Sequence, residues 1–280
     1  MDGGVTPLMG RALVLICLIA LFGPQELYAH AAADDLLQHF SREIKEKPRD
    51  QLLYIQRGNV YSIEGLYPQA LADFQRAAEL GDPILIGFDF GVLFYRMGEF
   101  DTARHYFDGF IGRFPNHPRA LEYRARLLRD AGDYPAAVAD FKRVFELQEH
   151  PNPGHYISTA KMLQSTGTAG IDQALVILDQ GNTKLGITPQ LQHYAIQLEL
   201  RRKRPEKAVE RMRELEPVLG GSPDWKVGMG ELMLQVGQPE QAEALLDAAS
   251  LQLDTLRKTP ARLALREKIN RMHATMAARR

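Results

Sequence analysis

Two arginines spaced three residues apart are the first candidates for chemistry in this sequence. Arg126 and Arg129 would lie on one face of a helix, where their guanidinium groups could hold a carboxylate or an acidic segment. Three acids nearby, Glu122, Asp130 and Asp133, could instead pair with them on a solvated helix face. Both interpretations stay open from the residues alone.

The densest basic run begins at residues 201–204 and continues along the next predicted helix. An acidic partner is one interpretation of this run. Acids alternate with its later basic residues at helical spacing, however, and this pattern favours a salt-bridged outer face. The interleaved residues are Glu206, Lys207, Glu210, Arg211, Arg213 and Glu214.

Metal and enzyme signatures are weak or missing in the sequence. The eight histidines are scattered. His150 and His155 flank a proline loop, but two histidines alone are poor evidence for a metal site. The sequence carries no phosphate loop, nucleophile elbow, HExxH motif or dinucleotide glycine pattern. It therefore predicts no metal, no cofactor and no enzymatic activity.

The composition is that of an ordinary globular chain, and it argues against nucleic acid as a partner. Of the 280 residues 45% are hydrophobic and 25% are charged, and the formal net charge is −1. The single cysteine, Cys17, lies in an apolar stretch that we expect to be removed. The remaining chain would then have no disulfide, no thiol catalysis and no cysteine-based metal site.

Residues 1–31 have the pattern of a secretory signal. Arg11 precedes the apolar stretch 12–22, and residues 29–31 form a small-x-small cleavage pattern. The stretch is shorter than the roughly 20 residues that a membrane-spanning helix needs. We therefore expect cleavage after Ala31, a periplasmic or secreted protein, and no stable membrane insertion afterwards. An uncleaved N-terminal membrane anchor is the alternative.

The elements that would position these residues follow from a pattern that occurs three times between residues 51 and 148. Small and large apolar residues recur in register, with copies 33 or 34 residues apart. The copies are Gly58, Tyr61, Gly65, Tyr67, Ala70, Phe74 and Ala77; Gly91, Phe94, Gly98, Phe100, Ala103, Phe107 and Phe110; and Ala125, Leu128, Gly132, Tyr134, Ala137, Phe141 and Val144.

Each copy predicts a helix, a tight turn and a second helix. In the first copy Gly65 would end one helix and Pro68 would open the next. The small residue in the first helix and the alanine in the second allow the two backbones to approach closely. One such hairpin cannot bury its apolar face alone, whereas stacked neighbours can.

This pattern resembles the tetratricopeptide repeat (TPR), and the resemblance becomes partial after residue 148. It implies an all-α, right-handed superhelical solenoid of about six helical hairpins with a capping helix at each end. A turn at 166–170 would be longer than the others. The expected segments are 1–31 (signal), 32–50 (N-terminal cap), 51–148 (three regular units), 149–252 (three divergent units) and 253–280 (C-terminal cap).

The resemblance also implies where a partner would bind. In TPR proteins the first helices of the hairpins line a concave groove that holds a protein or peptide. The residues expected in this groove are Asn59, Ser62, Val92, Tyr95, Arg126, Arg129, Lys161 and Gln164. The implied function is that of an exported, non-enzymatic scaffold. The alternative is an accessory factor that transiently holds an exported enzyme or envelope protein during assembly or maturation.

Overall fold

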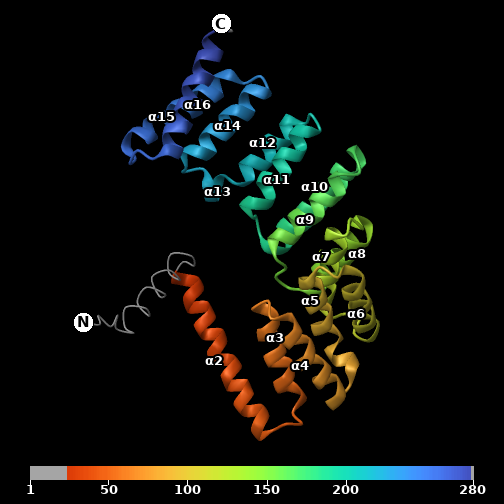
Figure 1. Cartoon of the computed structure of the whole chain (residues 1–280). Coiled ribbons are helices and arrows are strands. Elements are labelled where there is room, and N and C mark those ends of the chain that lie inside the picture. The colour runs from red at the N-terminus through yellow and green to blue at the C-terminus, as the bar shows by residue number, and fades with distance from the viewer. Residues whose placement is uncertain (1–23, 279–280) are drawn as a thin grey trace, which may run out of the picture. The chain divides into compact units, whose positions relative to one another are not determined.

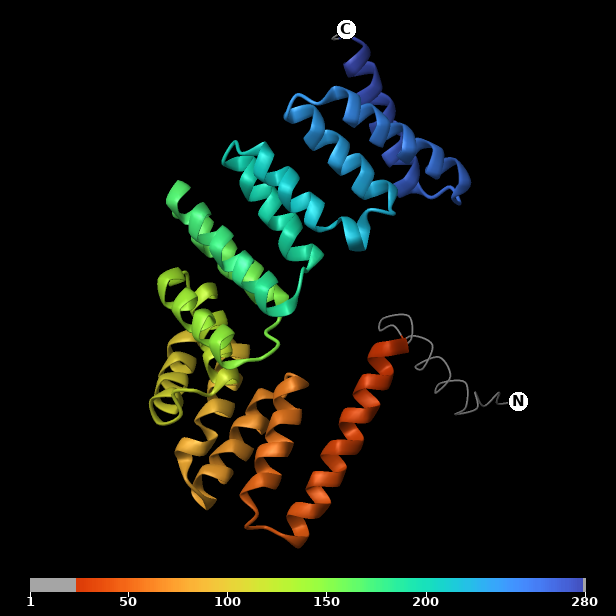
Figure 2. The ribbon, with the colours of Figure 1, turned by 180° about the vertical axis from the view of Figure 1, so that it is seen from behind.

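The computed structural model describes residues 24–278, which form fifteen α-helices and one short 3-10 helix (Figure 1). The described residues contain no strand. They divide into two compact units between Ala131 and Gly132. The division falls inside the third predicted hairpin. Helices that follow one another within each unit form antiparallel pairs, which Figure 2 shows from behind.

The first unit is built from two complete helical hairpins with a helix on either side. The hairpins are α3 with α4 and α5 with α6, while α2 precedes them and α7 follows. The elements are α2 (Pro24–Glu46), α3 (Gln51–Ile63), α4 (Tyr67–Leu80), η1 (Pro83–Ile86), α5 (Gly87–Met97), α6 (Phe100–Arg113) and α7 (Pro118–Asp130).

Helix α2 begins at Pro24, eight residues before the expected N-terminal cap segment 32–50, and the expected cleavage position falls within it. Its later part packs on the first hairpin, because Ile44 joins a core cluster with Tyr54 and Phe74. Arg57 also donates a hydrogen bond from Nη1 to the Ser41 hydroxyl, at 3.0 Å. This helix therefore covers the apolar face at the start of the unit.

Close approach within each hairpin depends on a glycine opposite an aromatic ring. A Cβ atom placed on Gly58 would lie 2.5 Å from the ring of Phe74, and one on Gly91 would lie 2.5 Å from the ring of Phe107. Both rings are fully buried. The small and aromatic positions of the repeated pattern are thus direct packing partners.

The second unit contains α8, three further hairpins, the short helix α13 and a final helix. The hairpins are α9 with α10, α11 with α12, and α14 with α15. The elements are α8 (Tyr134–Leu147), α9 (Pro153–Gln164), α10 (Thr168–Leu185), α11 (Pro189–Arg201), α12 (Pro205–Glu214), α13 (Glu216–Leu219), α14 (Pro223–Gln235), α15 (Pro239–Thr255) and α16 (Pro260–Ala277). Ile269 and Met276 of α16 pack into a cluster with Leu246 of α15, as the predicted apolar stripe requires.

The turn between α9 and α10 is shorter than we predicted. Helix α10 begins at Thr168, so only residues 165–167 connect the two helices. Gly167 has φ of +95°, which glycine adopts readily. A Cβ atom on Gly170 would lie 2.0 Å from the carbonyl oxygen of Leu163, so glycine lets α10 start against the end of α9. The glycines that suggested a long loop instead permit a compact turn.

The prediction of an all-α fold made of repeated helical hairpins is confirmed. No helix between residues 24 and 278 combines the length and apolar character needed to span a membrane. Arg11, Cys17 and the apolar stretch 12–22 lie outside the described residues.

Candidate partner-binding face

The first helices of the hairpins in the first unit, α3 and α5, and the following α7 share a set of linked polar and aromatic side chains. We call this set the α3–α5–α7 face. It consists of Asn59, Phe88, Asp89, Tyr95, Arg119, Tyr123, Arg126, Arg129 and Asp130. Four of these residues, Asn59, Tyr95, Arg126 and Arg129, were predicted from the sequence.

One end of the face is held by an amide and a carboxylate. Asn59 of α3 donates a hydrogen bond from Nδ2 to Oδ1 of Asp89 on α5, at 2.9 Å. Burial raises the pKa of Asp89, while the hydrogen bond from Asn59 and the charge of Arg119 act in the opposite direction. Asp89 lies three residues before Val92 on the same helix, and this spacing is the only signal by which the sequence could have identified it.

The other end links α5 to α7 through a shared carboxylate. The hydroxyl of Tyr95 donates to Oδ2 of Asp130. Arg129 donates from Nε to Oδ1 of Asp130 at 2.8 Å, and its Nη2 lies 2.8 Å from the same oxygen. Burial and the bond to Asp130 raise the pKa of Tyr95, so its phenol stays neutral. Arg129 is therefore engaged by an acid of its own helix, as the second interpretation of the arginine pair anticipated.

Aromatic rings fill the space between these two ends. Phe88 and Tyr123 meet edge to face with ring centroids 5.5 Å apart. Arg119 lies over the Phe88 ring at 5.5 Å, and Arg126 lies over the Tyr123 ring at 5.2 Å. Such cation–π contacts hold a guanidinium group in place while leaving its N–H donors available.

Of the two predicted arginines, Arg126 is the one whose guanidinium group is more available to bind a partner. Its nearest acid is Glu122, at 3.9 Å, which is too long for a hydrogen bond. Its side chain is 38% exposed. A positive group that is oriented by an aromatic ring and only loosely paired can still accept a carboxylate from outside.

The structure buries two of the eight predicted residues and places two others in the second unit. Ser62 and Val92 are only 3% and 8% exposed, because their sides of α3 and α5 are covered by neighbouring helices. Lys161 and Gln164 lie on α9 in the second unit. Lys161 stands 6.0 Å from the Tyr194 ring, and Gln164 donates to the Tyr194 hydroxyl and accepts from Arg201 at 2.7 Å.

The basic run forms the salt-bridged surface that we predicted. Arg211 is held by Asp179 of α10 at 2.6 Å and by Glu199 of α11 at 3.2 Å. Arg202 and Arg204 both pair with Asp172, at 2.8 and 3.3 Å. The interleaved Lys207–Glu210 pair is also present, at 2.7 Å. Acids of neighbouring helices supply most of these partners, which periodicity within one helix could not reveal.

Among the described residues no group of three or more histidine, cysteine, aspartate or glutamate side chains could hold a metal ion. His117 has a local structural role instead. It is the N-cap of α7, where its Nδ1 accepts a hydrogen bond from the backbone N–H of Ala120 at 3.1 Å.

The repeated hairpins define an all-helical repeat protein, and comparison with known proteins names the repeat. Residues 88–151 match the model of the tetratricopeptide repeat. This part of the chain is therefore similar to tetratricopeptide repeats, in agreement with the helical hairpins of the fold. Hsp70-Hsp90 organizing protein 2 of Arabidopsis thaliana is 28% identical over 89 residues, which are 31% of this chain and 16% of that protein.

Two solved structures are similar to this chain at low sequence identity. The structure of pilF from Pseudomonas aeruginosa has a TM-score of 0.53 and 14% identity, and the match covers 79% of this chain and 99% of that one. The yeast Tom70 structure has a TM-score of 0.48 and 22% identity, covering 84% of this chain and 46% of that one. The likeness to pilF concerns the fold alone.

Proposed function

We propose that this protein is an exported, non-enzymatic TPR scaffold that binds an acidic segment of a protein partner on the α3–α5–α7 face. The observation that carries the proposal is the position of Arg126, which lies over the Tyr123 ring 3.9 Å from its nearest acid. A carboxylate of a partner could form a charge-assisted hydrogen bond with this guanidinium group.

The contacts that link the three helices support the proposal, because they hold the face in one arrangement before binding. The Asn59–Asp89 bond joins α3 to α5, and the Tyr95–Asp130 bond joins α5 to α7. A preformed surface reduces the entropy that is lost on association. Aromatic and arginine side chains are also those most often found at the energetic centres of protein interfaces.

Export is supported by the sequence pattern of residues 1–31. A direct test is to express the full chain with a C-terminal tag in a Gram-negative bacterium and to sequence the N-terminus of the protein recovered from the periplasm. A mature protein that begins at Ala32 supports the proposal. A full-length chain found only in the membrane fraction supports the anchored alternative, and a full-length chain in the cytoplasm contradicts export.

Partner binding is tested by capture with the same C-terminally tagged chain. Arg126→Ala and Tyr123→Ala would each remove one side of the cation–π contact. Arg143→Ala is a matched control, because Arg143 is an exposed arginine on α8 in the second unit that pairs with Glu146. We expect a partner that the native chain and the control retain and that both face variants lose.

The captured partner would then be measured in solution. We expect Arg126→Ala to weaken its binding by about tenfold, the usual effect of losing a charge-assisted hydrogen bond of about 1.4 kcal/mol. Rising salt should reduce the difference between Arg126→Ala and the native chain. Equal binding by the native chain and both face variants would contradict the proposal and would show that the partner binds another surface.

A further inference from the structure

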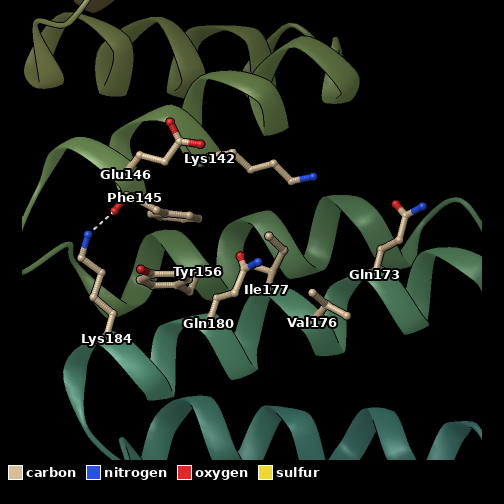
Figure 3. Close-up of a pocket in the computed structure, with 9 residues that line it drawn as sticks. All are labelled: Lys142, Phe145, Glu146, Tyr156, Gln173, Val176, Ile177, Gln180 and Lys184. Carbon is tan, nitrogen blue, oxygen red and sulfur yellow. Dashed lines mark hydrogen bonds between the residues drawn. The ribbon is translucent and has the colours of Figure 1, made fainter.

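An open hollow lies between α8 and α10 in the second unit (Figure 3). Its volume is about 410 Å³, and side chains of α8, α9 and α10 line it. This volume lies within the range of small-molecule sites in proteins. The lining residues come from three helices, so no motif in the sequence marks this place.

The floor of the hollow is apolar and rigid. The rings of Phe145 and Tyr156 stack with their centroids 3.8 Å apart and their planes at 11°. Tyr156 is only 1% exposed, and Ile177 beside it is buried. Val176 is an apolar side chain at the hollow that is 55% exposed. A short aliphatic chain that covers Val176 would remove this surface from water.

Three charged side chains lie at the rim of the hollow, and two of them have partners within the protein. Glu146 is engaged by Arg143 of its own helix. Lys184 donates a hydrogen bond to the carbonyl oxygen of Phe145 in the last turn of α8, where helix carbonyls lack partners within the helix. Lys142 makes no ion pair or hydrogen bond with any residue in the described range 24–278. The hollow therefore presents an available positive charge beside an apolar floor.

We propose that this hollow binds a small aliphatic carboxylate. The hydrocarbon chain would lie on Val176, Ile177 and the edge of Phe145, and the carboxylate would pair with the ammonium group of Lys142. Amines are disfavoured, because Lys142 and Lys184 would repel their charge. A neutral alcohol would keep the apolar contact but would lose the ion pair.

The test compares three probes of equal chain length on the full chain: octanoate, octylamine and octan-1-ol. Binding is followed by the NMR shifts of the Ile177 and Val176 methyl groups. We expect octanoate to bind tightest of the three, and Val176→Asp to abolish its binding by placing a negative charge on the floor. Equal affinity for all three probes, or no binding of octanoate, would overturn the proposal.

A pair of lysine variants separates the ion pair from general charge effects. Lys142→Met keeps the length of the side chain and removes its charge, and we expect it to weaken octanoate binding by about fivefold, the usual strength of a partly exposed ion pair. Lys207→Met is the matched control, since Lys207 is an exposed lysine on α12 outside this hollow. Circular dichroism would verify that each variant is folded. Unchanged octanoate affinity in Lys142→Met would overturn the assignment of this lysine.

Discussion

The ring of Phe74 occupies the space that a side chain on Gly58 would need, with its Cε1 atom 2.5 Å from the position of a Cβ atom. Phe107 stands in the same relation to Gly91, one repeat later. The distance is too short for real carbon atoms, so one of the two groups must shift if the glycine changes. This pairing explains why small and aromatic residues recur together in the repeated pattern.

Gly58→Ala should therefore destabilise the protein even though alanine favours helices. Overpacking in a core costs about 1–3 kcal/mol, and the gain in helix propensity is only about 1 kcal/mol. Shortening the opposing ring with Phe74→Leu should recover part of the loss in the double variant. Urea denaturation of the two single variants and the double variant measures this coupling. Simple additivity of the two single effects would contradict it.

Removing the acid of the Arg57–Asp73 ion pair should destabilise the protein much more than removing the acid of a surface pair. Arg57 donates to both carboxylate oxygens, at 2.8 and 2.7 Å, and the Asp73 side chain is only 7% exposed. Asp73→Ala would leave the arginine partly buried without its acid, and we expect a loss of about 3 kcal/mol in the free energy of unfolding.

The matched control for this pair is Glu79→Ala, which removes the acid of the exposed Arg76–Glu79 pair on the same helix as Asp73. We expect no measurable change in stability from Glu79→Ala, because water screens exposed pairs. Similar losses in Asp73→Ala and Glu79→Ala would show that burial does not strengthen the Arg57 pair.

Much of the fold follows from the sequence, because the repeated pattern encodes contacts within one hairpin. Gly58 and Phe74 belong to the same copy, and their pairing needs no information from elsewhere. The site is different. Ser62 and Val92 were expected to line the groove, yet they are buried, since helical periodicity gives the direction of a side chain but not the packing of the next helix. Asp89 was not predicted, because its burial and its bond to Asn59 depend on packing between two copies.

Asp89 should make the stability of the first unit depend on pH in an unusual direction. Burial raises its pKa, so the folded chain holds this proton more tightly than the unfolded chain does. Its contribution is therefore favourable at low pH and is lost as the pH rises above 3.8 and through the raised pKa. Asp89→Asn should increase the melting temperature at pH 7 relative to the native chain.

The comparison at low pH provides the check on Asp89. At pH 3.5 the native carboxyl is largely protonated, and we expect the difference in melting temperature between the native chain and Asp89→Asn to shrink. Asp108→Asn is the control, because Asp108 is an exposed acid on α6 that pairs with Arg124 at 2.8 Å. If Asp89→Asn increases the melting temperature equally at both pH values, the ionisation of Asp89 is not the cause of the increase.

His117 should make the start of α7 sensitive to mild acid. Its Nδ1 accepts the hydrogen bond from the N–H of Ala120, so the cap requires an unprotonated Nδ1. Burial lowers the pKa of His117, and the charge of Arg119 lowers it further. Since the unfolded chain takes up a proton first, the stabilising contribution is present above about pH 6.5 and is lost as the pH falls through the lowered pKa.

Replacing this histidine with a cap that does not titrate should remove the sensitivity. An asparagine N-cap accepts the same hydrogen bond at any pH between 5 and 8, and losing a cap costs about 1 kcal/mol. We therefore expect His117→Asn to lose less stability than the native chain between pH 7.5 and pH 5, measured by urea denaturation. His105→Asn, which changes an exposed histidine within α6, should behave like the native chain. If His117→Asn and the native chain lose equal stability on acidification, protonation of His117 does not weaken the start of α7.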